Sequence, residues 1–250
     1  MLSARLIPCL DVRDGRVVKG VRFANLRDAG CPVACATAYA EQGADEIALL
    51  DITATTEGRG NRLQTVRDVR AALTIPLTVG GGVRTVADAA ALLGAGADKV
   101  AVNTAAVRDP DLLTALADRF GRQCVVLAID AARDGLRWQV VVSAGAEPTG
   151  LDVVEWATRA TELGAGEILL TSWDRDGTRE GYDLALIAAV TAAVRVPVIA
   201  SGGASGPDHL AAALSAGASA VLAASIFHDG DYAVSTLKTE LRERGVEVRL

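Results

Sequence analysis

The chain contains the same glycine segment twice, 121 positions apart. Val79-Gly80-Gly81-Gly82 follows a Pro-Leu-Thr strand, and Ala200-Ser201-Gly202-Gly203 follows a Pro-Val-Ile strand. The same offset carries Gly96-Ala97-Asp98-Lys99-Val100 onto Gly217-Ala218-Ser219-Ala220-Val221. Landmarks that keep one offset indicate an internal repeat of one folding unit.

Short apolar runs alternate with longer helical patterns along the whole chain. The eight predicted strands are Leu6 to Leu10, Ile47 to Leu50, Leu77 to Val79, Val100 to Val102, Val125 to Ile129, Ile168 to Leu170, Val198 to Ala200 and Ala220 to Leu222. Helices are expected between them, for example over 32–42 and 109–119, each followed by glycine. This alternation predicts a single (β/α)8 TIM barrel domain over residues 1–250, with an internal two-fold half-barrel repeat. Two separate half-domains would leave open strand edges, and no linker divides the chain.

Two connections are longer than a barrel needs, and both follow strands. Residues 11–30 form a polar stretch that carries Lys19, with Asp14-Gly15 as a turn signal. Residues 134–150 include the alternating Leu136-Arg137-Trp138-Gln139-Val140, which predicts a small hairpin after the fifth strand. Long loops on this face of a barrel usually form lids or walls of a site.

Composition excludes several classes of partner. The formal charge is −6 and the cations are dispersed, so no nucleic-acid surface is expected. The uncharged run 210–227 is interpreted as helix, loop and strand, and no membrane span is expected. The start of the chain lacks an apolar leader, and four cysteines are too few for a disulfide scaffold, so the cytoplasm is the expected compartment.

No cofactor or metal is expected. No glycine segment has the full dinucleotide-binding spacing, and Gly94-Ala95-Gly96 precedes a strand instead of following one. Cys31 and Cys35 could share a helix face, but no third or fourth metal ligand lies near them in the sequence. His209 and His228 have no serine elbow to work with, which disfavours a Ser-His-Asp hydrolase.

Asp11 and Asp130 each end an apolar strand, the first and the fifth. Because the carboxyl ends of barrel strands converge on the catalytic mouth, the two carboxylates are predicted to face each other as an acid/base pair. The plainer alternative is that each aspartate caps a helix or closes a turn. The symmetric placement of the two aspartates on the first and fifth strands favours the catalytic interpretation.

The repeated glycines predict two phosphate sites, because glycine lets backbone N–H groups approach an anion. One site would use Gly81, Gly82, Asn103 and Thr104, and the other Gly202, Gly203, Ala224 and Ser225. A lone triple glycine would be only a tight loop. In both halves, however, the glycine segment is followed one strand later by a second segment, Asn103-Thr104 or Ala224-Ser225. This repeated combination favours phosphate binding and a substrate phosphorylated at both ends.

Further candidates lie at strand ends and around the opposite opening. Asp51, Thr171, Asp176 and Gly177 follow the second and sixth strands and are assigned to substrate binding, and Lys19 could close over a bound intermediate. Arg5, Glu46, Lys99 and Glu167 begin strands one, two, four and six. From the residues alone, this ring of opposite charges is expected to stabilise the barrel.

These residues together resemble the cyclase subunit of imidazole glycerol phosphate synthase, a histidine-biosynthesis enzyme. The motifs that carry the resemblance are Ile7-Pro8-Cys9-Leu10-Asp11, Lys19-Gly20-Val21, Leu26-Arg27-Asp28-Ala29-Gly30, Val102-Asn103-Thr104-Ala105-Ala106-Val107, Asp174-Arg175-Asp176-Gly177-Thr178, Ala200-Ser201-Gly202-Gly203 and Val248-Arg249-Leu250. Three features depart from the pattern: Cys31 replaces a usual aspartate, Ala101 replaces a common serine, and 143–148 lacks the usual basic residues.

The resemblance implies that ammonia from a separate glutaminase subunit passes through the barrel. There it would attack phosphoribulosyl-formimino-aminoimidazole carboxamide ribonucleotide and yield imidazole glycerol phosphate and aminoimidazole carboxamide ribonucleotide. Asp11 and Asp130 resemble the general acid/base pair and Lys19 the lid residue. The ring of Arg5, Glu46, Lys99 and Glu167 resembles an ammonia gate, which makes the N-terminal barrel face a partner interface.

Two alternatives stay open. The sibling isomerase of the same pathway shares the half-barrel repeat, both aspartates and both phosphate sites. Lys19-Gly20-Val21 and the complete charged ring favour the cyclase, since an isomerase need not admit ammonia. A non-catalytic bisphosphate-binding activator of a glutaminase is disfavoured by the presence of both Asp11 and Asp130.

Overall fold

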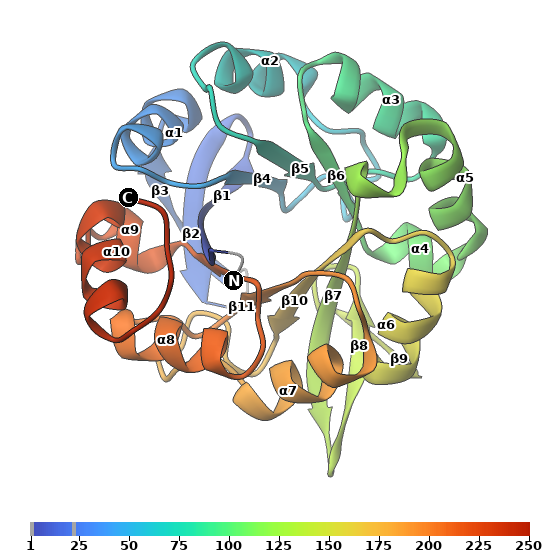
Figure 1. The fold of residues 1–250 in the computed structure, drawn as a ribbon. Coiled ribbons are helices and arrows are strands. Elements are labelled where there is room, and N and C mark those ends of the chain that lie inside the picture. The colour runs from blue at the N-terminus through green and yellow to red at the C-terminus, as the bar shows by residue number, and fades with distance from the viewer. Residues whose placement is uncertain (1–2, 22–23) are drawn as a thin grey trace.

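The computed structural model describes residues 3–21 and 24–250. Within these residues, eight parallel strands close into a barrel and the predicted (β/α)8 fold is confirmed (Figure 1). In order around the ring they are β1 (Arg5–Arg13), β4 (Ile47–Asp51), β5 (Leu77–Gly80), β6 (Lys99–Val102), β7 (Val125–Asp134), β10 (Glu167–Ser172), β11 (Val198–Ser201) and β12 (Ala220–Ala223). The ring closes because β12 pairs with β1 and β10 pairs with β7. Every strand predicted from an apolar run is present.

Helices connect the strands and surround the barrel (Figure 1). They are α1 (Pro32–Glu41), α2 (Leu63–Ala71), α3 (Val86–Gly94), α4 (Thr104–Arg108), α5 (Asp111–Phe120), α6 (Val153–Glu162), α7 (Leu184–Ala193), α8 (Pro207–Ser215), α9 (Ser225–His228) and α10 (Val234–Glu243), with a short 3-10 turn at Arg122–Cys124. Helix starts follow local chemistry: Thr85 and Asp88 form a capping box on α3, and Asp152 accepts two backbone N–H groups of α6. None of the described helices is long and apolar enough to cross a membrane.

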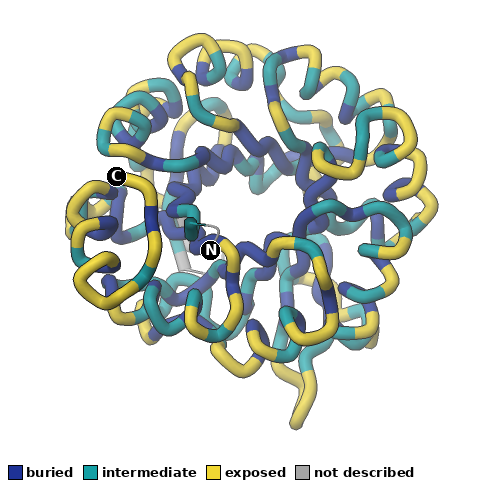
Figure 2. The backbone as a smooth tube through the Cα atoms, viewed as in Figure 1, coloured by how far each residue is buried: buried dark blue, intermediate teal, exposed yellow. Residues whose placement is uncertain are grey.

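The buried apolar residues form two regions. Figure 2 shows that buried residues follow the barrel strands, whereas exposed residues lie mainly on the surrounding helices and loops. The larger fills the space between strands and helices, and the smaller lies inside the barrel. The inner region includes Ile7, Cys9, Val126, Leu169 and Leu222, with Ala48, Ala101 and Ala220 among its small members. Outward-facing strand residues therefore anchor the helices, and inward-facing ones fill the barrel below its mouth.

Two antiparallel extensions leave the barrel at the carboxyl ends of β1 and β7. The hairpin predicted after the fifth strand is confirmed by β8 (Arg137–Val142) and β9 (Glu147–Asp152), which continue from β7. The connection over 11–30 contains β2 (Arg16–Val21) and β3 (Ala24–Gly30), a pairing that its polar sequence did not predict. Residues 22–23 between them lie outside the described part of the chain. Lys19 lies on β2 and is thereby placed above the end of β1.

Candidate active site

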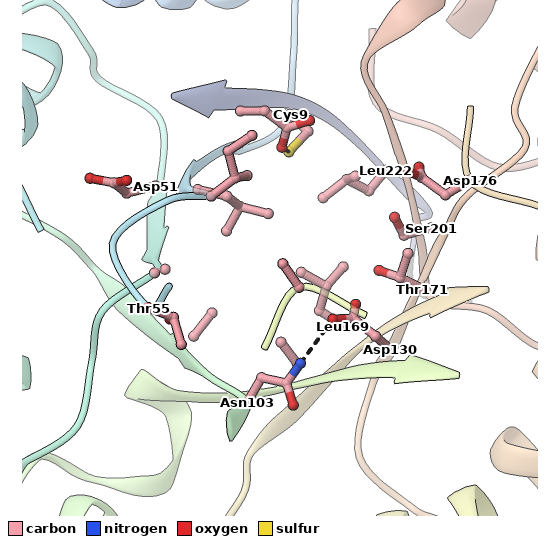
Figure 3. Close-up of a pocket in the computed structure, with 18 of the residues that line it drawn as sticks. Cys9, Asp51, Thr55, Asn103, Asp130, Leu169, Thr171, Asp176, Ser201 and Leu222 are labelled. Carbon is pink, nitrogen blue, oxygen red and sulfur yellow. Dashed lines mark hydrogen bonds between the residues drawn. The ribbon is translucent and has the colours of Figure 1, made fainter. Parts of the chain in front are cut away.

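One cavity of about 540 Å³ opens at the carboxyl ends of the barrel strands (Figure 3). It gathers all the residues assigned from the sequence to catalysis or substrate binding: Asp11, Lys19, Asp51, Gly81, Gly82, Asn103, Thr104, Asp130, Thr171, Asp176, Gly177, Gly202, Gly203, Ala224 and Ser225. These residues come from both halves of the repeat. The cavity therefore has the size and two-sided lining expected for a small extended metabolite.

Asp11 and Asp130 occupy equivalent positions of the two half-barrels. Asp11 is in register with Leu50 on β4, and Asp130 is in register with Thr171 on β10. Leu50 and Thr171 are themselves 121 positions apart, although the two aspartates are separated by 119. The strand register therefore shows that the two aspartates are equivalent, although their spacing in the sequence differs from that of the repeat.

The Asp130 carboxylate lies against Asn103, the residue that directly follows the neighbouring strand β6. Asn103 Nδ2 donates a hydrogen bond of 2.9 Å to Asp130 Oδ2 (Figure 3). Burial raises the pKa of Asp130 to about 7, the charges of Asp176 and Asp11 add to the rise, and the Asn103 hydrogen bond opposes it. A carboxyl group with this pKa exchanges its proton near neutral pH, as general acid/base catalysis requires. The buried Asn103 Oδ1 has no hydrogen-bond partner among the described residues.

Asp11 is buried, and two side chains approach its carboxylate. Lys19 Nζ lies 3.6 Å from Asp11 Oδ2, and Cys9 Sγ lies 3.4 Å from Asp11 Oδ1. Burial of Lys19 works to lower its pKa, but Asp11 and Asp176 outweigh burial and the net pKa of Lys19 is raised. Lys19 therefore carries its charge at the cavity mouth, in position to pair with Asp11 or with an anion.

His228 supports the strand that carries Asp11, a contact that the sequence did not indicate. Its Nε2 lies 3.0 Å from the Cys9 carbonyl oxygen, and its Nδ1 lies 2.7 Å from Tyr39 Oη. Burial lowers the pKa of His228, which favours the neutral ring. The imidazole thus links α9 to the middle of β1 and does not line the cavity as a catalytic group.

The glycine segments leave no room for side chains. Gly81 has a φ of +93°, and a Cβ there would lie 2.0 Å from the Asp51 carbonyl oxygen. Gly202 has the same φ, and a Cβ there would lie 2.7 Å from the Ser172 carbonyl oxygen. Asp51 and Ser172 are again 121 positions apart. Both segments are therefore built alike, with bare backbone lining the cavity in each half.

Asp51 and Asp176 lie on opposite sides of the cavity but are not equivalent in the repeat (Figure 3). Asp51 matches Ser172 by position, and Asp176 matches Thr55. The Asp51 carboxylate is bound by Arg59 through two contacts, Nη1 to Oδ2 at 2.6 Å and Nη2 to Oδ1 at 2.9 Å. It also accepts the Ala54 N–H at 3.1 Å. Asp51 thus organises the loop that follows β4, whereas Asp176 adds negative charge near Asp130.

Several cavity residues were not found from the sequence. Arg84, Arg108 and Arg179 supply cations to the lining, and Thr55 and Ser201 supply hydroxyl groups. Arg84 Nη1 bonds to the Gly58 carbonyl oxygen at 2.8 Å, and Arg108 Nη2 pairs with Glu147 at 3.1 Å. Thr55 could have been found as the counterpart of Asp176. The arginines have no counterpart in the other half-repeat to mark them.

The loop over 143–148 forms a wall of the same cavity. Ala144 lines the cavity, and the Ser143 N–H donates to Thr104 Oγ1 at 3.0 Å. Ser143 and Ala144 both have positive φ values, of 56° and 57°. This loop therefore contacts the first glycine site through its backbone, in place of the basic side chains that it lacks.

At the amino ends of the strands, Arg5, Glu46, Lys99 and Glu167 form a closed ring of ion pairs. Arg5 Nη1 lies 2.9 Å from Glu46 Oε2, and Arg5 also bonds to Glu167. Lys99 Nζ lies 2.8 Å from Glu46 Oε2 and 2.7 Å from Glu167 Oε2. Thr78 Oγ1 donates to the second oxygen of Glu46 at 2.5 Å. All four charges are thus paired with neighbours around the ring.

Among the described residues, no group of three or more His, Cys, Asp or Glu side chains is arranged to hold a metal ion. The cavity chemistry that these residues offer is proton transfer by two carboxyl groups, with backbone and arginine groups for anions.

Comparison with known proteins gives a consistent result. The sequence model of a family described as "Histidine biosynthesis protein" matches residues 5–233. Two relatives named "Imidazole glycerol phosphate synthase subunit HisF", from Dehalococcoides mccartyi strains BAV1 and CBDB1, are each 57% identical over 251 residues. Each alignment covers 100% of this chain and 99% of the relative.

Proposed function

This chain belongs to the histidine biosynthesis protein family, and we propose that it is the cyclase subunit of imidazole glycerol phosphate synthase. The observation that carries the proposal is the placement of Asp11 and Asp130 at equivalent register positions on opposite half-barrels, within one cavity that both glycine segments line. An elongated substrate with a phosphate at each end fits this arrangement. The relatives' similarity over the full length supports the same activity.

The glycine segments bind the two phosphates through backbone N–H groups. Gly81 and Gly82 with Asn103 and Thr104 serve one phosphate, and the equivalent residues around Gly202 and Ser225 serve the other. Arg84 and Arg108 lie in the same cavity wall and add positive charge. The substrate is thereby held by its ends, which leaves its reacting centre between the two aspartates.

Asp11 and Asp130 transfer the protons of the reaction. Ammonia attacks the phosphoribulosyl end of the substrate, and cyclisation and cleavage give imidazole glycerol phosphate, aminoimidazole carboxamide ribonucleotide and one water molecule. Asp130, with its pKa near 7, can both give and take a proton at neutral pH. Lys19, 3.6 Å from Asp11, closes the cavity mouth and keeps a positive charge over the reacting groups.

Ammonia reaches the cavity from the opposite face in this proposal. The relatives are named as subunits, and a glutaminase subunit that supplies ammonia binds at the amino ends of the strands. The ring of Arg5, Glu46, Lys99 and Glu167 closes that end with paired charges. A side chain of the ring must move for ammonia to pass, so the ring acts as a gate as well as a stabilising network.

The test is turnover of the phosphoribulosyl substrate by the purified chain with ammonium salt and no partner. Asp130→Asn should lower the rate by about 10²–10⁴-fold, the range for loss of an acid/base group. Asp134→Asn is the matched control, because Asp134 lies further along the same strand and is exposed. Turnover of the isomerase's substrate alone would instead identify the sibling enzyme, and ligand binding without turnover would identify a non-catalytic activator.

A further inference from the structure

Cys31 is the N-cap residue of α1, and Cys35 lies in the first turn of that helix. The Cys35 N–H donates to the Cys31 carbonyl oxygen at 3.0 Å, which sets the spacing of that turn. Cys31 is exposed and Cys35 is half-buried. The first cysteine is therefore open to small reagents, and the second lies one hydrogen-bonded turn further along the chain.

The two thiols lie in one electrostatic environment. Burial raises the pKa of Cys35, and the neighbouring Cys31 raises it further, whereas Arg16 lowers it. Arg16 itself forms a two-point ion pair with Asp28, with contacts of 2.9 Å and 3.0 Å. The charge of Arg16 interacts with both thiols, and its ion pair with Asp28 holds the guanidinium group beside them.

The other cysteines differ from this pair. Cys9 is 2% exposed, and burial raises its pKa well above the ordinary value, so it stays a thiol. Cys124 lies at the end of the 3-10 turn before β7, with no second cysteine on its own element. Cys31 and Cys35 therefore differ from Cys9 and Cys124, because they combine an exposed thiol with a second cysteine four residues away.

We propose that Cys31 and Cys35 form a reversible dithiol/disulfide pair. The Cys31 thiolate attacks one sulfur of a low-molecular-weight disulfide such as oxidised glutathione, and the S–S bond of that molecule breaks to release one glutathione thiolate. The Cys35 thiolate then attacks the Cys31 sulfur and releases the second glutathione. Two protein thiols are oxidised to one disulfide, one glutathione disulfide is reduced to two thiols, and the protein protons pass to them.

The geometry permits this bond and makes it alter the local backbone. Cys31 is the N-cap of α1, with extended backbone angles of φ −84° and ψ 129°, and Cys35 lies in the first turn that follows it. A disulfide requires their Cβ atoms to lie about 3.5–4.5 Å apart, closer than the roughly 5–6 Å typical of side chains one helical turn apart. Oxidation therefore draws the N-cap residue toward the first turn of α1. A bond that must deform its helix is more readily reduced than an unstrained one, as a switch requires.

That turn contacts the base of the β2–β3 hairpin. Cys35 Sγ lies 3.8 Å from the Ala29 carbonyl oxygen, and a Cβ on Gly30 would lie 3.4 Å from the same sulfur. The hairpin register shifts beside Ala29, where Val17 pairs with Gly30 but Val18 pairs with Asp28. Lys19 belongs to the same hairpin and pairs with Arg27. Oxidation of the cysteines should therefore change the strand pairing that holds Lys19.

The experiment uses the full chain, incubated with oxidised glutathione and then mapped by mass spectrometry and thiol titration. Wild type should lose two of its four free thiols and two hydrogen atoms of mass, with the bond located between Cys31 and Cys35, and dithiothreitol should reverse the change. Cys35→Ser should instead trap a glutathione adduct on Cys31. Cys124→Ser is the control and should oxidise as wild type does.

Amide hydrogen exchange provides a second readout that does not depend on catalysis. Oxidised wild type should exchange faster in β3 and the first turn of α1 than the reduced protein, and Cys31→Ser should show no such change. A stable glutathione adduct on wild-type Cys31 with no internal bond, or a bond that involves Cys124, would overturn the proposal. Unchanged exchange in the oxidised protein would overturn its connection to the hairpin.

Discussion

Asn103 Nδ2 donates a 2.9 Å hydrogen bond to Asp130 Oδ2, and this bond opposes the burial that raises the pKa of Asp130 to about 7. Asn103 directly follows β6 and Asp130 lies on the neighbouring strand β7, so the barrel itself fixes their approach. The carboxylate is stabilised by one amide and destabilised by its surroundings and by Asp176 and Asp11. Its proton affinity is thus a balance that single substitutions can shift in either direction.

Removal of the Asn103 amide should raise the pKa of Asp130 further. In Asn103→Leu the carboxylate loses its donor, and because a hydrogen bond to a charged group contributes about 1.5–3 kcal/mol, the pKa should rise by about one unit or more. The pH dependence of turnover with ammonium salt, or a carboxyl titration followed by NMR, measures the shift. Asn61→Leu serves as control, because Asn61 bonds to the carbonyl oxygen of Gly80 and not to Asp130. A pKa that falls in Asn103→Leu would contradict the assigned balance.

Asp130 should also make the protein less stable as pH rises. Its pKa is raised from 3.8 to about 7 on folding, so between these values the folded state binds more protons than the unfolded state. The free energy of unfolding therefore falls as pH rises through that interval. Asp130→Asn removes this loss and should be more stable than wild type by at least about 1 kcal/mol at about pH 8, which raises Tm by about 2–4 °C.

The difference between the two proteins should shrink as pH falls toward 4, where wild-type Asp130 is protonated in the folded protein. Thermal unfolding followed across this range in matched buffers measures it. Asp134→Asn removes an exposed carboxylate from the same strand and should leave the pH profile unchanged. An Asp130→Asn variant that is less stable than wild type at high pH would show that the carboxylate is well solvated or paired.

The glycine segments allow a prediction that separates backbone conformation from space. Gly81 and Gly43 have similar φ values, +93° and +88°, but a Cβ on Gly81 would lie 2.0 Å from the Asp51 carbonyl oxygen, whereas Gly43 has nothing within 4 Å. Gly43→Ala should cost about 1 kcal/mol for the left-handed backbone alone. Gly81→Ala should cost at least about 2 kcal/mol more, because the segment must move.

Urea unfolding measures both losses, and inorganic phosphate provides a functional readout. Phosphate should raise the Tm of wild type and Gly43→Ala, and should raise that of Gly81→Ala less, because one of its two sites is displaced. Equal phosphate stabilisation in all three proteins would mean that the Gly81 segment does not bind phosphate.

Much of this site could be predicted from strand ends. Asp11, Asp130, Thr171 and the glycine segments all follow apolar runs, and a parallel barrel brings the carboxyl ends of its strands to one face. The internal repeat then identified equivalent residues in the two halves of the chain. Asp11 and Asp130 are an exception, because they are 119 positions apart and the glycine segments are 121 apart. Only the register with Leu50 and Thr171 shows why they are still equivalent.

Other parts could not be predicted because they depend on side chains that meet across loops. Arg59 is eight residues from Asp51 in an irregular segment, and nothing in the sequence indicates that it binds that carboxylate at two points. The β2–β3 hairpin has little apolar alternation, so its pairing was missed. It is held by backbone pairing and by ion pairs such as Arg16 with Asp28.

Two substitutions can distinguish whether the ion-pair ring acts as an ammonia gate or only stabilises the barrel. Lys99→Met leaves Arg5 as the one cation of the ring that pairs with Glu46 and Glu167. Lys238→Met breaks a buried pair with Asp45, 2.9 Å apart, that lies outside the ring. Both changes should lower the free energy of unfolding, by about 3 kcal/mol for the fully buried Lys238 pair and less for Lys99. Of these two lysines, Lys99 belongs to the ring at the barrel end and Lys238 does not. Lys99→Met alone should therefore reduce the product formed per glutamine hydrolysed in the complex with the glutaminase. Turnover with free ammonium should stay near wild type in both variants. If Lys99→Met and Lys238→Met alter that ratio equally, or neither alters it, the ring acts on stability alone and ammonia does not pass through it.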